Sequence, residues 1–298
     1  MASRDKAGID LHIHSTASDG TFSPAEIIRE ARRLGLLAIA ITDHDTVAGV
    51  RDAITSGIPG DLGFLTGVEI SSTPPFPFTC PGSFHLLGYG VAIESGPLSH
   101  LLSTLRRARQ ERNPKIIQRL INIGIDISLK AVAEASGDVQ LSRPHIARYL
   151  VQGGFAASMQ DAFDKFLGAS GQAYVEKYLA DAEEVIGVIR TAGGLPVLAH
   201  PFLCAAAHPE HTGPEALEQL IRALQPMGLA GIEVYHPGHT DREQRDLLNL
   251  AHRLRLLATG GSDFHGAMKR TIRMGQGDGN LFVPVECYTR LTDALKRP

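Results

Sequence analysis

The sequence predicts an α/β fold in which parallel strands close into a barrel, with one helical insertion in the chain. Three observations support this. Seven apolar, strand-like runs each reach a His, Asp or Glu at or just beyond their end, except one run that begins with His. Helical patterns separate most of these runs, which is typical of βα repeats. Between residues 100 and 171 the repeat fails and only helical patterns remain.

The predicted strands cover residues 9–14, 36–44, 63–69, 85–91, 195–200, 230–236 and 256–265. Residues 36–41 are continuously apolar, as expected for a parallel strand that is buried on both faces. An antiparallel sandwich fits this pattern less well, whereas a doubly wound parallel sheet is a reasonable alternative to the barrel.

The predicted helices between the strands cover residues 24–34, 47–55, 182–191, 215–227 and 242–254. Three of their starts match the capping-box pattern, in which Ser or Thr is followed three residues later by Glu: Ser23 with Glu26, Thr212 with Glu215, and Thr240 with Glu243. Glycines at positions 35, 193 and 228 mark helix ends.

The insertion divides the predicted barrel into residues 1–99 and 172–298, with a helical domain over residues 100–171. Its helical patterns cover residues 101–123, 129–135, 144–151 and 159–167. Because it follows the fourth strand, we expect it to act as a lid or specificity module over the mouth of the barrel. A purely structural excursion is the alternative.

Composition indicates a soluble globular protein, since 43% of the 298 residues are hydrophobic and 20% are charged. A net charge of −3 provides no overall attraction to nucleic acid or to anionic membranes. The three cysteines are too scattered for a disulfide framework or a thiolate zinc site, which favours a reducing compartment. With no apolar leader segment and no membrane-length run, we predict a cytoplasmic protein without a membrane partner.

Nine potential metal ligands follow the strand ends: His12, His14, Asp19, His44, Glu69, His85, His200, Asp263 and His265. Because the carboxyl ends of parallel strands meet at one edge, we expect these side chains to converge. Partly buried carboxylates without partners would each cost several kcal/mol, so the cluster requires bound cations or protonation. Mixed imidazole and carboxylate ligands suit manganese, zinc or iron.

The motifs DLHIHSTASDG, AITDHDT, GVEIS, FHLLGYG, VLAHP and GSDFH resemble those of the PHP (polymerase and histidinol phosphatase) family, in the amidohydrolase superfamily. The resemblance runs almost end to end and implies a distorted (β/α)7 barrel that holds up to three metal ions. Within that family, the insertion motif LSRPHIAR at residues 141–148 resembles the bacterial subgroup that contains 3',5'-nucleotide bisphosphate phosphatase and a 5'-to-3' RNA exonuclease.

The resemblance also implies three groups of ligands. A first metal would be held by His12, His14, Glu69 and Asp263. A second would be held by Asp19, His44 and His265. A third would be held by His85 and His200, with Glu69 bridging to it. The family often has His where this chain has Asp19, so we predict a harder second site that favours Mn²⁺ over Zn²⁺.

Closely spaced metal ions suit phosphoester hydrolysis, because they activate water and stabilise the leaving oxygen. We expect Asp263 to orient or deprotonate that water as well as to bind metal, although a role as a plain ligand fits equally well. Arg143 and His145 suit a phosphate contact, with a solvated helix start as the alternative. His236 and His239 could contact substrate or be exposed loop residues.

We therefore predict a phosphatase that removes the 3'-phosphate from 3',5'-bisphosphorylated nucleotides such as adenosine 3',5'-bisphosphate. A 5'-to-3' exonuclease acting on short RNA is the close alternative. The basic run at residues 106–119 lacks interleaved aromatics and the chain has no Trp, so a stacking platform for long single strands is poorly supported. A noncatalytic metal-binding scaffold is an alternative of another class, and C–N bond hydrolysis fits less well. We predict no protein partner.

Overall fold

The protein is described as a computed structural model that covers residues 8–136 and 141–297 of the 298-residue chain. The chain forms two compact units, Met1–Leu101 with Leu179–Pro298, and Leu102–Tyr178. We call them the barrel unit and the insertion unit. The predicted insertion ended at residue 171, whereas the compact insertion unit extends to Tyr178.

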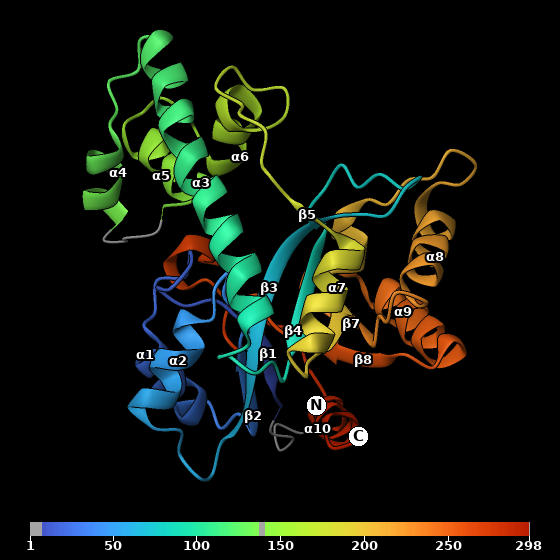
Figure 1. The fold of residues 1–298 in the computed structure, drawn as a ribbon. Coiled ribbons are helices and arrows are strands. Elements are labelled where there is room, and N and C mark those ends of the chain that lie inside the picture. Colours follow the sequence, from blue (N-terminus) through green and yellow to red (C-terminus); the bar gives the residue numbers. More distant parts are fainter. Residues whose placement is uncertain (1–7, 137–140, 298) are drawn as a thin grey trace. The chain divides into compact units, whose positions relative to one another are not determined.

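The barrel unit is built on one curled sheet (Figure 1). Its strands follow the order β1 (Asp10–Ile13), β2 (Ala38–Ile41), β3 (Gly63–Thr73), β4 (His85–Tyr89), β6 (Leu195–Leu198), β7 (Gly231–Tyr235) and β8 (Leu257–Gly260). A short strand that was not predicted, β5 (Ala180–Asp181), pairs with the end of β3. The two edges of the sheet meet where the His14 amide donates to the Phe264 carbonyl at 2.9 Å. This confirms the predicted distorted seven-stranded barrel.

The direction of β4 corrects the expectation of a parallel sheet. β4 pairs antiparallel with both β3 and β6, whereas the other strand pairs are parallel. Ser71 near the end of β3 therefore lies opposite His85 at the start of β4. The reversal explains why this run begins with His: its first residue reaches the edge at which the parallel strands end.

Helices flank the sheet close to their predicted bounds: α1 (Pro24–Arg33), α2 (Ala48–Ser56), α7 (Ala182–Thr191), α8 (Gly213–Leu224) and α9 (Asp241–Leu254). The capping boxes at the starts of α1 and α9 form as predicted, with Ser23 and Thr240 as caps. The third prediction is wrong, since Thr212 makes no side-chain cap hydrogen bond and α8 begins with a Gly-Pro pair.

A terminal helix, α10 (Val285–Leu295), was not predicted from the sequence. Its Cys287 and Leu291 are buried in the core inside the barrel, together with Ile9 and Leu11 of the first strand region. Tyr288 approaches the first residue of β3, Gly63, so α10 covers the end of the barrel where the parallel strands begin. Two 3-10 turns, η2 (Pro201–Cys204) and η3 (Gly266–Lys269), follow the strand ends on the other side.

The insertion unit is helical, as expected. It comprises most of α3 (Gly96–Asn122), then α4 (Leu129–Ser136), α5 (Arg143–Gln152), α6 (Met159–Ala162) and a π-helical turn, η1 (Phe163–Leu167). Its own apolar core includes Ile116, Leu120, Ile146, Leu150 and Leu167.

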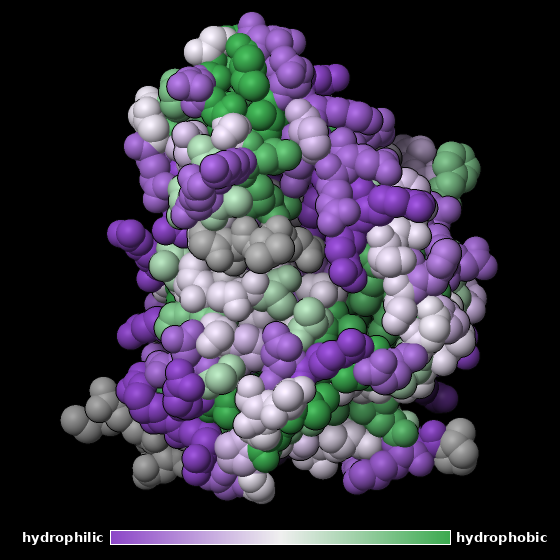
Figure 2. All heavy atoms as spheres, turned by 60° about the vertical axis from the view of Figure 1, so that its left-hand side comes forward, coloured by the Kyte–Doolittle hydropathy of each residue, from purple (hydrophilic) through white to green (hydrophobic). Residues whose placement is uncertain are grey.

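Hydrophilic side chains cover much of the face of the molecule in Figure 2, with groups of hydrophobic ones between them. Within the described residues, none of the helices has the length and apolar character required to cross a membrane.

Candidate metal centre

The nine predicted ligands all lie in the barrel unit, at the edge where the parallel strands end. His12 belongs to β1, with His14 directly after it, and Asp19 lies in the loop that follows. Glu69 lies inside the long strand β3 and His85 opens β4. The structure brings these side chains together into three overlapping groups around one carboxylate.

Glu69 is the centre of the arrangement and is almost fully buried. Its Oε1 lies 2.7 Å from His85 Nδ1 and 3.0 Å from His200 Nε2. Its Oε2 lies 3.3 Å from His12 Nε2, 3.2 Å from His14 Nε2 and 3.0 Å from His44 Nδ1. Each oxygen therefore faces a different set of histidines, which is the geometry required of a carboxylate that bridges two metal ions.

The first group consists of His12, His14 and Asp263 beside Glu69. Asp263 Oδ1 lies 3.6 Å from His12 Nε2 and 3.3 Å from His14 Nε2. These ligand atoms lie within 4.8 Å of one another, which is close enough to surround one ion.

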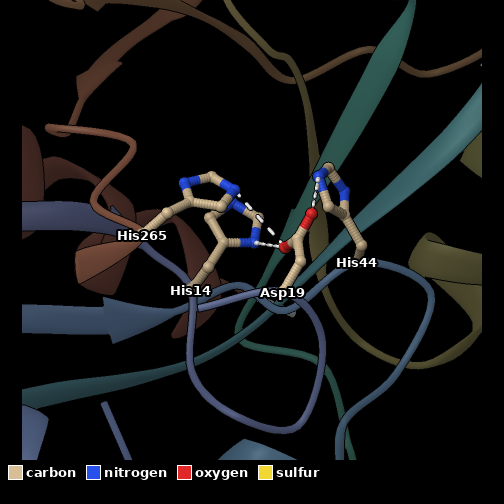
Figure 3. Close-up of side chains that lie close together, drawn as sticks. All are labelled: His14, Asp19, His44 and His265. Carbon is tan, nitrogen blue, oxygen red and sulfur yellow. Dashed lines mark ion pairs between the residues drawn. The ribbon is translucent and has the colours of Figure 1, made fainter. Parts of the chain in front are cut away.

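The second group surrounds Asp19 (Figure 3). Its carboxylate oxygens lie 3.7 Å from His14 Nδ1, 3.9 Å from His44 Nε2 and 3.4 Å from His265 Nε2. The family resemblance had placed His14 in the first group alone. In the structure its two ring nitrogens face the two groups, so His14 lies between them.

The third group contains His85 and His200 around Glu69 Oε1, as the resemblance implied, and ligand atoms of His44, Glu69 and His85 also lie within 4.8 Å of one another. The His44 and His85 rings are 5.1 Å apart, and His44 Nδ1 faces Glu69 while its Nε2 faces Asp19. The resemblance had placed His44 only in the second group. In the structure its ring lies between the second and third groups, as His14 lies between the first and second.

Several buried polar atoms of this cluster have no hydrogen-bond partner among the described residues: His12 Nε2, both ring nitrogens of His14, Asp19 Oδ1, His44 Nδ1 and Glu69 Oε2. An unsatisfied buried polar group costs about 1–3 kcal/mol, and more if it is charged. These atoms point toward one another, and divalent cations between them would satisfy them. The residues present therefore fit a metal centre.

The charges of the cluster suit metal binding. Burial acts to raise the pKa of Glu69, but its electrostatic interactions with the surrounding histidines, His44 foremost, outweigh burial and lower that pKa well below its usual value. Burial lowers the pKa of His85 to about 4, so its ring is neutral at pH 7. Metal ions bind carboxylates and neutral imidazoles in these forms.

Two residues of the cluster have left-handed backbone conformations. His200 has φ of 29° and Asp263 has φ of 53°. Such a conformation costs of the order of 1–3 kcal/mol for a residue with a side chain, and it is concentrated at functional sites. Both residues lie just beyond the ends of β6 and β8, and the turn at His200 brings its Nε2 to 3.0 Å from Glu69 Oε1.

Three acidic residues and one lysine of this edge were not singled out from the sequence: Asp10, Asp43, Glu233 and Lys269. Asp43 accepts hydrogen bonds from Ser15 and Ser18, which fixes the loop that carries Asp19. Glu233 is fully buried and its Oε1 accepts from His12 Nδ1 at 2.9 Å. Lys269 Nζ lies 2.5 Å from Asp263 Oδ2. A signal for Glu233 did exist, because it interrupts the apolar run of β7.

His236 and His239 are both buried, so the alternative of exposed loop residues is wrong. His236 Nε2 lies 3.6 Å from Asp263 Oδ2, and its Nδ1 accepts from the Gly238 amide. His239 Nδ1 donates to the Val234 carbonyl at 2.9 Å. Both rings line a pocket of about 290 Å³.

Arg143 and His145 lie in the insertion unit, at the start of α5. His145 Nδ1 accepts from the Ser142 amide at 3.0 Å, and Arg143 donates to the Leu167 carbonyl at 3.2 Å. The motif therefore does form a helix start, but His145 is buried rather than solvated. A phosphate contact by these residues stays a prediction.

Comparison with known proteins agrees with this geometry. The model of the PHP domain family matches residues 10–249. The chain is 33% identical to a 5'-3' exoribonuclease from Haemophilus influenzae, over 86% of this chain and 89% of that protein. It is also 33% identical to a 3',5'-nucleoside bisphosphate phosphatase from Chromobacterium violaceum, over 87% of each. A solved structure from Bifidobacterium adolescentis, described as a candidate metal-dependent phosphoesterase, superimposes with a TM-score of 0.82 at 28% identity, over 98% of this chain and 97% of that one. The chain belongs to the PHP domain family.

Proposed function

We propose that this protein removes the 3'-phosphate from 3',5'-bisphosphorylated nucleotides such as adenosine 3',5'-bisphosphate. Its family and its relatives already make it a metal-dependent phosphoester hydrolase. The observation that carries the proposal is the position of Glu69, whose two oxygens face separate groups of ligands. The name of the Chromobacterium violaceum relative supports the choice of substrate.

Two or three divalent ions would be held by the nine residues. His12, His14, Glu69 and Asp263 form the first site, Asp19, His44 and His265 the second, and Glu69, His85 and His200 the third. His14 and His44 face two groups each. When bound, such ions activate water and stabilise the leaving oxygen. We propose Mn²⁺, with Zn²⁺ or Fe²⁺ as alternatives, because Asp19 provides a hard oxygen ligand.

Asp263 is the proposed catalytic carboxylate. Its Oδ1 faces the first group, whereas its Oδ2 faces Lys269 and His236. Oδ1 is therefore the oxygen placed to orient or deprotonate a water molecule at the ligand group, while Oδ2 is held by Lys269 and His236. Lys269 and the histidines lower the pKa of Asp263 against the opposing effect of burial, so the carboxylate is anionic when it acts.

The substrate contacts proposed are His236 and His239 in the barrel unit and Arg143 and His145 in the insertion unit. The two barrel histidines line one pocket, and His239 Nε2 has no hydrogen-bond partner among the described residues. A cytoplasmic location is also proposed, which the three free cysteines support.

The test is a comparison of products. Protein supplied with Mn²⁺ is incubated with adenosine 3',5'-bisphosphate, with adenosine 5'-monophosphate and with a short 5'-phosphorylated RNA. The proposal predicts free phosphate and adenosine 5'-monophosphate from the first compound and slower reaction of the others. Release of adenosine 3'-monophosphate, or no phosphate at all, would contradict it.

A 5'-to-3' exoribonuclease is the second candidate, because the Haemophilus influenzae relative carries that name at the same identity. Faster release of mononucleotides from the RNA than of phosphate from the bisphosphate would favour it. Metal binding without hydrolysis of any phosphoester would instead indicate a noncatalytic scaffold.

A further inference from the structure

Glu233 lies in the middle of β7 and has no solvent exposure. Its two carboxylate oxygens accept hydrogen bonds from two different parts of the metal centre. Oε1 accepts from His12 Nδ1 at 2.9 Å, and Oε2 accepts from the backbone amide of His200 at 2.7 Å. His12 belongs to the first ligand group and His200 to the third, so Glu233 connects the two.

The contact with His12 determines which ring nitrogen faces the metal centre. A neutral imidazole carries one N–H, and a carboxylate acceptor at Nδ1 holds the hydrogen there. The lone pair then lies on Nε2, which is 3.3 Å from Glu69 Oε2 and 3.6 Å from Asp263 Oδ1. The nitrogen able to bind a metal thus points at the other ligands of the first group.

The second contact of Glu233 is with the backbone amide of His200, and it fixes the main chain at that residue. This residue has φ of 29°, a conformation that its surroundings must hold in place. Its amide hydrogen bond to Glu233 fixes the peptide unit that leads into the turn. The ring then places Nε2 3.0 Å from Glu69 Oε1.

We propose that Glu233 is a positioning residue that holds His12 in its metal-binding tautomer and His200 in its strained turn, and so supports the first and third groups together. The second group does not depend directly on Glu233. Among the described residues, Glu233 forms no hydrogen bond with Asp19, His44 or His265. This inference rests on the metal-binding part of the proposed function.

The test uses Glu233→Gln, which preserves the size of the side chain. An amide has one oxygen, whereas His12 and His200 both offer N–H donors, so one of the two contacts is lost. Outer partners of metal ligands commonly contribute about 10- to 100-fold to metal affinity. We expect Zn²⁺ and Mn²⁺ affinities, measured by competition with a chromogenic chelator, to fall by about that factor.

Val234→Ala is the matched control, because it removes buried apolar volume next to Glu233 but on the opposite face of the same strand. It should lower the melting temperature of the metal-free protein while leaving metal affinity within about 2-fold of wild type. An equal loss of affinity in both variants would show that Glu233 acts only through general stability, and would overturn the proposal.

Nitrogen-15 NMR of labelled histidine gives a readout independent of turnover. In the zinc-loaded wild type we expect the His12 proton on Nδ1, and in Glu233→Gln a loss of that single state. Adding Glu233→Ala to a His12→Ala variant should weaken metal binding further, because the His200 contact is then also lost. A His12 proton on Nε2 in the wild type, or wild-type affinity in Glu233→Gln, would refute the inference. If metal affinity falls as expected but no substrate releases phosphate, only the proposed reaction fails.

Discussion

Lys269 Nζ lies 2.5 Å from Asp263 Oδ2, on the side of the carboxylate that does not face the first ligand group. The lysine side chain is 43% exposed, so one end of this ion pair reaches the solvent edge of the site. Asp263 can therefore face the metal centre through Oδ1 while Oδ2 remains paired with a positive charge. One oxygen of Asp263 thus faces the ligand group while the other is held by Lys269, and this arrangement supports the catalytic role proposed for Asp263.

Lys269→Met should shift the acidic limb of the activity profile to higher pH. Lys269 helps to lower the pKa of Asp263, and a carboxylate that must be anionic stops working below its pKa. Removing the lysine raises that pKa, so activity is lost at a higher pH as the solution becomes more acidic. The measurement is kcat/KM over a pH range that extends below 4, with exposed Arg270→Met as the control. An unchanged acidic limb would argue against the ion pair having this role.

Arg143→Ala should impair turnover without loss of metal. A charge-assisted hydrogen bond to phosphate contributes about 1.5–3 kcal/mol, so we expect kcat/KM to fall by about 10- to 100-fold. Arg106→Ala, at an exposed position of the basic run, provides the control for general loss of charge. The checks are steady-state kinetics and metal analysis of both variants. If the two variants behave alike, Arg143 serves only the helix start and its bond to Leu167.

His239 should make the protein less stable in mild acid. Burial lowers its pKa to about 4, whereas an imidazole in the unfolded chain titrates near 6.5. Below pH 6.5 the unfolded state therefore takes up a proton that the folded state does not. The free energy of unfolding falls by up to about 3 kcal/mol as the pH drops to 4.

His239→Gln removes this contribution, so the stability difference between wild type and variant should shrink as the pH is lowered from 7 to 4. Urea unfolding of the metal-free proteins at several pH values measures it. Parallel stability curves for the two proteins would show that the ring titrates normally.

Strand ends were the part of the site that the sequence revealed best. A polar residue after an apolar run has a defined place in a parallel α/β fold, and most of the ligands follow that rule or its reversed form at His85, whereas His12 and Glu69 lie within β1 and β3. The direction of β4 was not predictable, because the apolar character of residues 85–91 is the same in either direction. The one indication of the reversed direction was that this run begins, rather than ends, with a histidine, His85.

Other features depend on three-dimensional contacts. The double orientation of His14 and His44 comes from which ring nitrogen faces which carboxylate, and no sequence pattern encodes it. Lys269 follows the last motif by four residues in a turn without periodicity. The helix α10 had a readable signal in the spacing of its apolar residues, which pack inside the barrel, but its place there required the fold.

The central claim is that Glu69 joins two metal sites that together hydrolyse the substrate. The most direct measurement is the metal content of Glu69→Gln and wild type, taken from the same preparations that are assayed for phosphate release from adenosine 3',5'-bisphosphate. The account predicts that the variant loses metal from the first and third groups and that phosphate release falls by more than about 100-fold, because the bridging residue matters at least as much as an outer partner. A variant with wild-type metal content and wild-type phosphate release would contradict it.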